Sequence, residues 1–519
     1  MQPIILVNPK MCSPNSMRLP LSLLALAAVL EGKYDYHLID GNVDSNAEQE
    51  IHKLIEDHGC TLLALTVMPG PQVPTAISIS KSVRERFPNT AIVWGGYFPT
   101  LYTESALNAP YVDFVIRGQG EDTLLELIER LPDSGPPQLS NLSSVKDSSA
   151  IKTIQSLSWK DQGEHVHNAD RHFRSPDVYP LYPYHKLKNV EIYLRPSFMG
   201  SRTAVHQAAV GCRYHCSFCG VVSMFNGYTK LPAAARLRES IILLKQYGAN
   251  ALQFYDHNFF DREQDTLPLV EEMARHDLPW WCYARSDALA NASDDMWRLI
   301  QKSKLRMAYI GAEAGSDEAL KAMRKGTRSD QTLIAAEKCR QYGVIPEFSF
   351  VLGGPDEPEE EIGRTFSFIR LLKKIHPQCE VILYFYSPTP QREKKKKIIV
   401  SDQNNLLATQ RPQMQSYGAE GPTMPITPEE WTEKRWMDFV CHRDAPWLTD
   451  KIRSQVKGFD RVLSCRYPTV QDHTMSNLAK ASLKALSYWR YAAQYYENPW
   501  ELDWAHRTLK LRIPKEQSI

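Results

Sequence analysis

The sequence predicts an α/β protein in three parts: an N-terminal doubly wound parallel sheet, a central partial (β/α)6 barrel and a C-terminal helical region. Short apolar runs alternate with helical stretches over roughly the first 131 residues, which is typical of parallel sheets covered by helices. The alternation resumes near residue 189 for about six units. After about residue 390 it stops. We therefore expect domains at 1–135, 189–390 and 391–519, joined by a linker at 136–188.

The first domain is predicted from apolar strands that each end in a turn or glycine signal. The expected strands are 4–7, 36–39, 61–67, 91–94 and 114–116, and the expected helices are 21–30, 75–87 and 123–131. Ligands of such sheets bind beyond the carboxyl ends of the strands. The loops Gly95-Gly96 and Gly118-Gln119-Gly120-Glu121 fall at those ends, where a backbone can closely approach a ligand.

The linker is predicted from a change in composition, since residues 134–144 are rich in serine and proline. A linker of this length favours some structure of its own, such as a hairpin within 151–165. The barrel that follows is predicted from strands at 204–210, 251–255, 280–283, 306–310, 348–352 and 381–386, with helices at 234–247, 266–275, 294–302, 329–342 and 359–375. Its active site is expected at the carboxyl ends of these strands.

The C-terminal part begins with a polar, basic stretch at 392–425 and continues as aromatic-rich helices. Aromatic residues at helical spacing are more often core than ligand, so we expect most of them to be buried. We also expect this region to cap the barrel mouth and shape a substrate pocket. The expected core aromatic residues are Trp431, Trp436, Trp447, Tyr488, Trp489, Tyr491, Tyr495, Tyr496, Trp500 and Trp504.

Composition excludes several classes of partner. The net charge of the 519 residues is +1, so nothing favours nucleic acid, and the tract Lys394–Lys397 is interpreted as a solvated loop. No run of eighteen apolar residues indicates a transmembrane segment, and the first residues lack the features of a signal peptide. Seven cysteines are scattered without a pairing pattern, which favours the reducing cytoplasm.

The other three cysteines, Cys212, Cys216 and Cys219, form a C-x3-C-x2-C run that follows the first barrel strand. Iron–sulfur clusters are usually held by four thiolates, so three would leave one iron open to a small molecule. A structural zinc site wants four ligands, commonly as two spaced pairs, and the sequence contains no second CxxC pair. The run therefore favours an open cluster over zinc or three ordinary buried cysteines.

This run, with Phe218 before its last cysteine, resembles the signature of the radical S-adenosylmethionine superfamily. The resemblance implies a [4Fe-4S] cluster whose open iron is chelated by S-adenosylmethionine. It also implies reductive cleavage of that molecule to a 5'-deoxyadenosyl radical, with an electron donor such as flavodoxin or ferredoxin.

Polar residues end four further strands in an order that resembles cobalamin-linked members of this superfamily. The motifs are Phe254-x-Asp256-x-x-Phe259, Arg285-x-Asp287, Gly311-x-Glu313-x-Gly315-Ser316 and Gly353-x-Pro355. The resemblance implies that S-adenosylmethionine is bound by Phe218, Asp256, Arg285, Glu313 and Gly353, with Glu313 and Arg285 as acceptor and cation. The alternative for each charged residue is an ion pair that closes the barrel mouth. No residue is assigned a catalytic role.

The order of glycine loops in the first domain resembles the cobalamin-binding domain that precedes many radical S-adenosylmethionine domains. The resemblance implies a cobalamin site formed by Thr66, Met68, Gly95, Gly96, Gly118, Gly120 and Glu121. The sequence departs from the methionine-synthase type, because it lacks the Asp-x-His-x-x-Gly motif that supplies a histidine to cobalt. The alternative is an inherited α/β domain that binds no ligand.

Together these resemblances predict cobalamin-dependent methyl transfer to an unactivated carbon of a small-molecule or lipid substrate. The runner-up is radical cyclisation or oxidation without methyl transfer, as in the similar anaerobic magnesium-protoporphyrin ester cyclase. A non-enzymatic iron–sulfur redox sensor is the third hypothesis, and the polar residues at four strand ends argue against it. Methylthiolation is disfavoured, because only Cys12 and Cys60 are available in the first domain for the extra cysteine trio of such enzymes.

Overall fold

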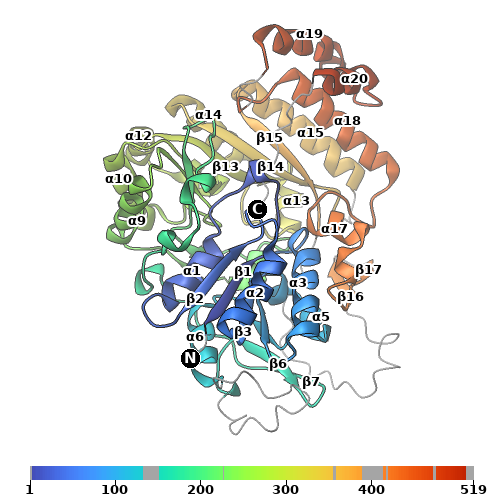
Figure 1. The fold of residues 1–519 in the computed structure, drawn as a ribbon. Helices are drawn as coiled ribbons and strands as arrows, with labels where there is room; N and C mark the ends of the chain where they lie inside the picture. Colours follow the sequence, from blue (N-terminus) through green and yellow to red (C-terminus); the bar gives the residue numbers. More distant parts are fainter. Residues whose placement is uncertain are drawn as a thin grey trace.

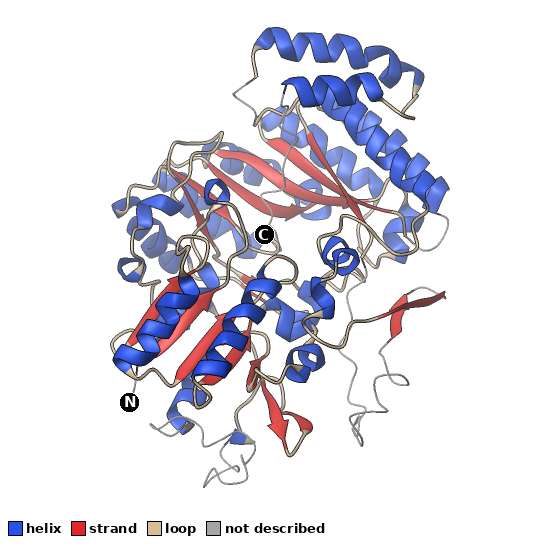
Figure 2. Cartoon of the chain, turned by 45° about the vertical axis from the view of Figure 1, so that its right-hand side comes forward, coloured by secondary structure: helices blue, strands red, loops and turns tan. Residues whose placement is uncertain are grey.

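A computed structural model describes residues 3–131, 151–225, 227–354, 358–387, 413–416, 419–471 and 475–509. It contains two large sheets, each covered by helices, with the C-terminal helices beside the second sheet (Figures 1 and 2). The N-terminal parallel sheet, the parallel barrel sheet and the C-terminal helices confirm the predicted fold class. The tract Lys394–Lys397 and residues 355–357 lie outside the described residues.

The first sheet has the order β2-β1-β3-β4-β5-β6-β7. Its first five strands are parallel: β1 (Ile4–Asn8), β2 (Tyr36–Asp40), β3 (Leu62–Thr66), β4 (Ala91–Gly95) and β5 (Phe114–Ile116). Side chains of alternate residues enter cores on opposite faces, for example Ile5 and Val7 on one face and Ile4 and Leu6 on the other.

Six helices cover the faces of this sheet. They are α1 (Leu21–Leu30), α2 (Ala47–His58), α3 (Gln72–Arg86), α4 (Tyr97–Leu101), α5 (Thr103–Asn108) and α6 (Glu121–Arg130). Apolar residues of α1 and α6 share one core with the sheet, and those of α2, α3 and α5 share the other. A sheet buried on both faces explains why its strands read as continuous apolar runs.

Part of the segment expected to be a linker extends the first sheet. The antiparallel strands β6 (Leu157–Asp161) and β7 (Glu164–His167) form a hairpin that pairs with β5. Gln162 and Gly163 both have positive φ, 51° and 86°, as in the two-residue turns favoured by hairpins. Trp159 is only 3% exposed, so this hairpin belongs to the core of the first domain.

The second sheet is the predicted partial barrel. Six parallel strands lie in the order β15-β14-β13-β12-β11-β8, with β8 and β15 as its two edges. They are β8 (Thr203–His206), β11 (Ala251–Phe254), β12 (Trp280–Arg285), β13 (Leu305–Glu313), β14 (Ile345–Leu352) and β15 (Glu380–Phe385). Because β8 and β15 do not pair with each other, the sheet is an open partial barrel.

The long barrel helices follow the strands, as predicted. They are α9 (Ala234–Gln246), α10 (Glu263–His276), α12 (Asp294–Lys302), α14 (Ser329–Tyr342) and α15 (Pro358–Ile375). The shorter elements are β9 (Val210–Gly211), α8 (Gly220–Phe225), β10 (Thr229–Lys230), α11 (Ser286–Asn291) and α13 (Asp317–Ala322). All of these short elements follow strand ends, where the candidate site residues gather.

The C-terminal region contacts both domains. It comprises β16 (Gln413–Ser416), β17 (Ala419–Thr423), η6 (Glu430–Thr432), α17 (Lys434–Val440), α18 (Asp450–Arg466), α19 (Asn477–Ala493) and α20 (Trp500–Leu509). Trp431 is buried against the first domain, where its indole N–H donates to Ser105 Oγ at 3.2 Å. Helix α18 packs on α15 through the stacked rings of Phe366 and Phe459, 3.8 Å apart.

The prediction that the C-terminal aromatic residues form core holds for one group and is wrong for another. Trp431 and Trp436 are 2% and 3% exposed, whereas Trp500 and Trp504 are 68% and 67% exposed. Tyr488 and Trp489 of α19, and Tyr495 in the loop after it, also lie on the surface. Helical spacing alone does not reveal which face of a helix is covered, because α19 and α20 pack against α18 on one side only.

The barrel mouth is covered by the segment between α17 and α18 instead of by the outer helices. The Trp447 indole N–H donates to the Gly353 carbonyl at 2.9 Å, and the Phe385 N–H donates to the His442 carbonyl, also at 2.9 Å. The opposite end of the barrel is closed by residues after α18. There the Thr469 hydroxyl and the Val470 N–H both donate to Glu380.

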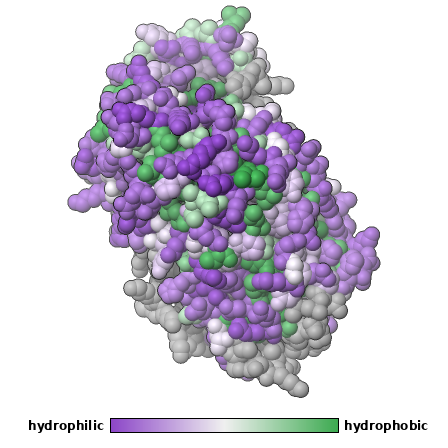
Figure 3. All heavy atoms as spheres, turned by 90° about the vertical axis from the view of Figure 1, so that its left-hand side faces the viewer, coloured by the Kyte–Doolittle hydropathy of each residue, from purple (hydrophilic) through white to green (hydrophobic). Residues whose placement is uncertain are grey.

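No helix in the described ranges is long and apolar enough to cross a membrane. The face drawn in Figure 3 is mostly hydrophilic, with hydrophobic residues in patches across its middle.

Candidate cofactor sites

The three cysteines of the C-x3-C-x2-C run lie on one loop between β9 and α8. Cys216 is buried, Cys212 and Cys219 are partly exposed, and none forms a disulfide. The loop is anchored to the barrel by Ser217, whose N–H and hydroxyl both donate to the Met323 carbonyl, at 2.9 and 3.1 Å. Three free thiols on an anchored loop fit the ligand set of an iron–sulfur cluster.

Two cations lie beside these thiols. Arg285 Nη1 is 3.9 Å from Cys216 Sγ, and its guanidinium stacks 3.4 Å from the ring centroid of Tyr214. Lys325 is buried, and its ammonium lies 6.0 Å from the Phe218 ring. Burial raises the pKa of the Cys219 thiol to about 12, and the neighbouring Cys216 adds to this effect. The nearby positive charges act in the opposite direction to burial and favour the thiolate, which is the form of cysteine that binds metal.

No group of three His, Cys, Asp or Glu side chains in the described parts of the chain is arranged to hold a single metal ion. The cysteine loop suits a larger inorganic cluster, in which each thiolate binds a different iron.

Glu313 and Arg285, expected to bind S-adenosylmethionine, lie at the carboxyl ends of adjacent strands and each has an ionic partner. Lys325 Nζ lies 2.6 Å from Glu313 Oε1, and Arg285 pairs with Asp287 at 2.9 Å. Burial lowers the pKa of Lys325, but Glu313 and Cys216 together outweigh it, so the pKa is raised and the ammonium stays charged. The spacing of residues in the sequence did not predict that Lys325 would lie in this site.

Asp256, at the end of β11, holds the chain that leads into the cysteine loop. Its carboxylate accepts hydrogen bonds from the N–H groups of Ala208 and Ala209. Burial raises the pKa of Asp256 to about 7, although those two N–H donors lower it. The side chain is therefore already engaged in shaping the loop after β8, and a direct role toward a ligand stays a prediction.

Phe218 and Gly353, the other two residues expected near S-adenosylmethionine, lie at the same end of the barrel. Phe218 packs against an apolar cluster that includes Leu320, Met323 and Val351. Gly353 follows β14 and carries the carbonyl that Trp447 bonds. The fold thus brings the five expected residues and the three cysteines to one edge of the sheet.

A second site is the interdomain cavity, of about 210 Å³, between the carboxyl edge of the first sheet and the barrel. Six of the seven residues expected to bind cobalamin line it: Thr66, Gly95, Gly96, Gly118, Gly120 and Glu121. The seventh, Met68, does not line this cavity, and its N–H donates to Gln72 Oε1 at 2.7 Å. Burial raises the pKa of Glu121 to about 7.

Gly96 has a φ of 94°, and a Cβ at this position would lie 3.1 Å from Thr66 Oγ1 and from two backbone atoms of Val67. Only glycine leaves this cradle open without strain. The cavity wall also includes residues that sequence reasoning missed, because they come from the linker and from the barrel. These are chiefly Tyr179, Tyr182, His206, Phe225 and Arg236.

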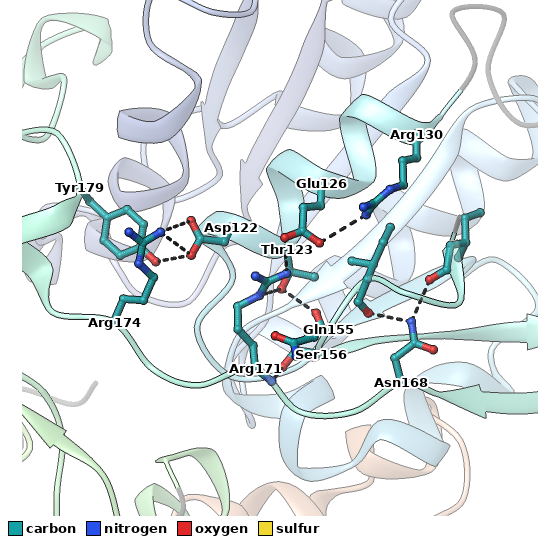
Figure 4. Close-up of polar contacts among 12 residues, drawn as sticks. Asp122, Thr123, Glu126, Arg130, Gln155, Ser156, Asn168, Arg171, Arg174 and Tyr179 are labelled. Carbon is teal, nitrogen blue, oxygen red and sulfur yellow. Dashed lines mark hydrogen bonds and ion pairs between the residues drawn. The ribbon is translucent and has the colours of Figure 1, made fainter. Parts of the chain in front are cut away.

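The linker residues that cover the cavity are fastened to α6 (Figure 4). Asp122 accepts hydrogen bonds from Arg174 at 3.2 Å and from the Tyr179 hydroxyl at 3.0 Å. Arg171 pairs with Glu126 at 2.7 Å and also donates to Thr123 Oγ1. These contacts place Tyr179 and its neighbours as a wall over the carboxyl edge of the first sheet.

The two sites are joined through Tyr97, the first residue of α4. Its hydroxyl lies against Gly220, the residue directly after Cys219, and interacts with the Gly220 backbone. Burial raises the pKa of Tyr97 well above its usual range, and nearby Cys219 adds to this effect. The loop at Gly96 and the cysteine loop are therefore in contact.

Comparison with known proteins gives two family matches: the B12 binding domain over residues 18–128 and the Radical SAM superfamily over residues 207–369. An uncharacterized methyltransferase of Pyrococcus horikoshii is 24% identical over 75% of this chain and 80% of its own length. An anaerobic magnesium-protoporphyrin IX monomethyl ester cyclase of Cereibacter sphaeroides is 23% identical over 64% of this chain and 53% of its own.

A similar solved structure is the radical S-adenosylmethionine methyltransferase TsrM of Kitasatospora setae, with cobalamin and a [4Fe-4S] cluster bound. Its TM-score is 0.62 at 17% identity, and the match covers 98% of this chain and 99% of that one. The cobalamin-dependent radical enzyme OxsB matches with a TM-score of 0.59 at 18% identity, over 71% of this chain and 52% of its own. At these identities the likeness concerns the fold.

Proposed function

Because this chain is a radical S-adenosylmethionine enzyme with a B12-binding domain, we propose that it transfers a methyl group to an unactivated carbon of a small-molecule or lipid substrate. The Radical SAM domain implies a [4Fe-4S] cluster and S-adenosylmethionine, and the B12-binding domain implies cobalamin. When bound, these groups supply the radical and the methyl group.

The observation that carries the proposal is the contact between Tyr97 and Gly220. It places the residue that follows Gly96, a glycine of the cavity wall, against the residue that follows Cys219. Methyl transfer to a carbon radical needs both cofactors within reach of one substrate, and distant sites could not serve it. A B12-binding domain kept only by inheritance would have no reason to contact the cysteine loop.

In this proposal Cys212, Cys216 and Cys219 hold the cluster. Arg285 and Lys325 place positive charge beside it, and Lys325 also orients Glu313. Phe218, Asp256, Arg285, Glu313 and Gly353 surround S-adenosylmethionine, with Asp256 acting mainly through the loop it holds. Thr66, Gly95, Gly96, Gly118, Gly120 and Glu121 bind cobalamin in the interdomain cavity.

The barrel interior supports an apolar or aromatic substrate. Trp281 and Tyr283 have ring centroids 4.6 Å apart, and Tyr283 and Tyr309 are 5.0 Å apart. The Tyr309 hydroxyl donates to the Tyr384 hydroxyl at 2.9 Å. Tyr283, Tyr309 and Tyr384 stay half-buried although they lie on barrel strands. Such rings offer a large contact surface with few charges.

The second candidate is cyclisation or oxidation without methyl transfer, which the similarity to the magnesium-protoporphyrin ester cyclase favours. The test is one anaerobic assay of the reconstituted protein with dithionite, hydroxocobalamin and S-adenosylmethionine carrying a CD3 group. Methyl transfer predicts 5'-deoxyadenosine, S-adenosylhomocysteine and transfer of the CD3 group to the bound corrinoid.

Deoxyadenosine without CD3 transfer would favour the cyclase-type reaction. A protein with a full cluster that makes no deoxyadenosine, or whose yield is unchanged by Cys216→Ala, would contradict the radical chemistry itself. In this proposal the electron donor is a flavodoxin or ferredoxin. The proposed location of the protein is the cytoplasm, where an oxygen-sensitive cluster would stay reduced.

A further inference from the structure

His206 is the last residue of β8 and lines the interdomain cavity. Its backbone is fixed by the pairing of β8 with β11, where it stands opposite Phe254, and its carbonyl accepts the Tyr255 N–H at 2.8 Å. Its ring meets those of Tyr182 and Phe254 edge-on, each at 6.1 Å between centroids. The imidazole is therefore held in one orientation in the cavity wall.

Among the described residues, one ring nitrogen of this histidine has no polar partner. His206 is only 7% exposed, and its Nδ1 is buried with no hydrogen-bond partner among the described residues. Buried polar groups are nearly always hydrogen-bonded, since an unpaired one is costly. Burial, with a smaller contribution from nearby Arg236, lowers the pKa of His206 to about 4, so the ring is neutral at physiological pH. Because Nδ1 is the ring nitrogen that is buried, Nε2 is the one left to meet a molecule in the cavity that His206 lines.

The buried nitrogen also indicates which tautomer is present. A neutral imidazole has one N–H and one acceptor nitrogen. A buried N–H without a partner is rarer than an unpaired acceptor. The proton therefore belongs on Nε2, and Nδ1 is left as the acceptor.

A metal-ligating histidine almost always donates its other ring N–H to a carboxylate, a carbonyl or water. Nδ1 of His206 has no such acceptor among the described residues. The arrangement thus suits a hydrogen-bond donor better than a cobalt ligand.

We propose that His206 donates a hydrogen bond from Nε2 to an acceptor oxygen of the cobalamin in the interdomain cavity, and so holds it from the barrel side. This inference rests on the proposed function, in which cobalamin occupies that cavity. The acceptor is an amide carbonyl on the corrin rim or the phosphodiester of the nucleotide tail. His206 is thus a cofactor-binding residue supplied by the Radical SAM domain.

The test compares His206→Gln with His206→Met in the full chain. The two replacements are close in size and shape, and only glutamine keeps an N–H donor. Hydroxocobalamin is titrated into each protein anaerobically and bound corrinoid is measured by its visible spectrum. We expect His206→Gln to bind within about 3-fold of the wild type and His206→Met to bind about 3- to 10-fold more weakly.

Cobinamide, which keeps the corrin amides and lacks the nucleotide tail, separates the two acceptors. If His206→Met weakens the binding of cobinamide and cobalamin equally, the acceptor is a corrin amide. If it weakens the binding of cobalamin alone, the acceptor is the phosphodiester. His376→Met is the matched control, because His376 is also a buried barrel histidine and bonds the Val344 carbonyl away from the cavity. Its affinity for cobalamin should not change.

Equal affinity of wild type and His206→Met for both corrinoids would overturn the inference. So would nitrogen splitting in the electron paramagnetic resonance spectrum of bound cob(II)alamin that disappears in His206→Met, since it would make His206 a cobalt ligand. If His206→Met does not fold, as judged by circular dichroism, His206→Phe gives the same comparison. A wild type that binds no corrinoid at all would instead contradict the cobalamin dependence in the proposed function.

Discussion

The hydroxyl of Tyr97 occupies the space that a Cβ atom on Gly220 would need. Tyr97 begins the helix after the glycine loop of the first domain, and Gly220 follows the last cysteine of the cluster loop. Any side chain at residue 220 would therefore push apart the two loops assigned to cobalamin and to the cluster.

Gly220→Ala should destabilise the protein by about 1–3 kcal/mol, the usual cost of overpacking, and should lower its iron content after reconstitution. Removing the opposing ring in the double variant Tyr97→Ala/Gly220→Ala should restore part of the iron. The readouts are urea unfolding and iron analysis. Gly363→Ala is the control: no atom lies within 4 Å of its Cβ position, and on the exposed face of a helix it should be neutral or slightly stabilising. Unchanged iron in Gly220→Ala would show that the contact does not position the loop.

Replacing any one of Cys212, Cys216 and Cys219 by alanine should remove most of the iron and abolish deoxyadenosine formation, because each thiolate holds a different iron. Cys441→Ala serves as the control, since Cys441 is partly exposed, forms no disulfide and lies outside the run. Iron and sulfide analysis measures the first effect and liquid chromatography the second. A variant of the run that kept a full cluster would remove that cysteine from the ligand set.

Lys325→Met should destabilise the protein by about 3–5 kcal/mol, because it leaves the Glu313 carboxylate buried without its ionic partner. Adding Glu313→Gln should recover part of the loss. Lys188→Met removes two ion pairs, with Asp44 and Glu50, whose lysine is 53% exposed, and we expect a change of about 1 kcal/mol or less. Urea unfolding of the cluster-free proteins gives all three values. A loss below about 1 kcal/mol in Lys325→Met would mean that the pair is solvated.

Asp256 should make stability depend on pH. Its pKa is raised to about 7 in the folded protein from 3.8, so the folded state keeps a proton that the unfolded chain loses as pH rises from about 4 to 7. Stability must fall with pH over that window. In Asp256→Asn this contribution is absent, and the decline in unfolding free energy between pH 4.5 and 7.5 should be smaller by about 2–4 kcal/mol.

The matched control for this measurement is Asp295→Asn, whose side chain is 91% exposed and which should leave the pH profile unchanged. Parallel profiles for Asp256→Asn and the wild type would mean that Asp256 is ionised throughout, held by the N–H groups of Ala208 and Ala209.

The fold was predictable where strands are apolar on both faces. Residues 21–30, 294–302 and 329–342 are helical in the structure over the predicted bounds. The hairpin of β6 and β7 was hard to place, since its strands are short and part of its sequence is polar. The exposed Trp500 and Trp504 show a second limit of sequence-based prediction. Helical spacing indicates which residues share a face of the helix, but it does not indicate whether another element packs on that face.

Some residues of the candidate site could also be predicted from the sequence, and others could not. Residues that follow strand ends, such as Glu313 and Gly96, were found because the topology of a parallel sheet gathers strand ends at one edge. Lys325 and His206 were missed because their roles come from distant partners. Lys325 reaches Glu313 from the segment after α13, and His206 faces a cavity whose opposite wall lies in another domain.

The contact between Ser105 and Trp431 joins residues 326 positions apart. At the usual speed of protein synthesis, the ribosome needs roughly 20–60 s to add that many residues. During this interval the nascent first domain can form its sheet, but Phe98 and Tyr102, which pack against Trp431, have no cover. The first domain is thus completed only after the whole barrel has been translated, and a chain released early would present an aromatic patch to the cell's chaperones and proteases.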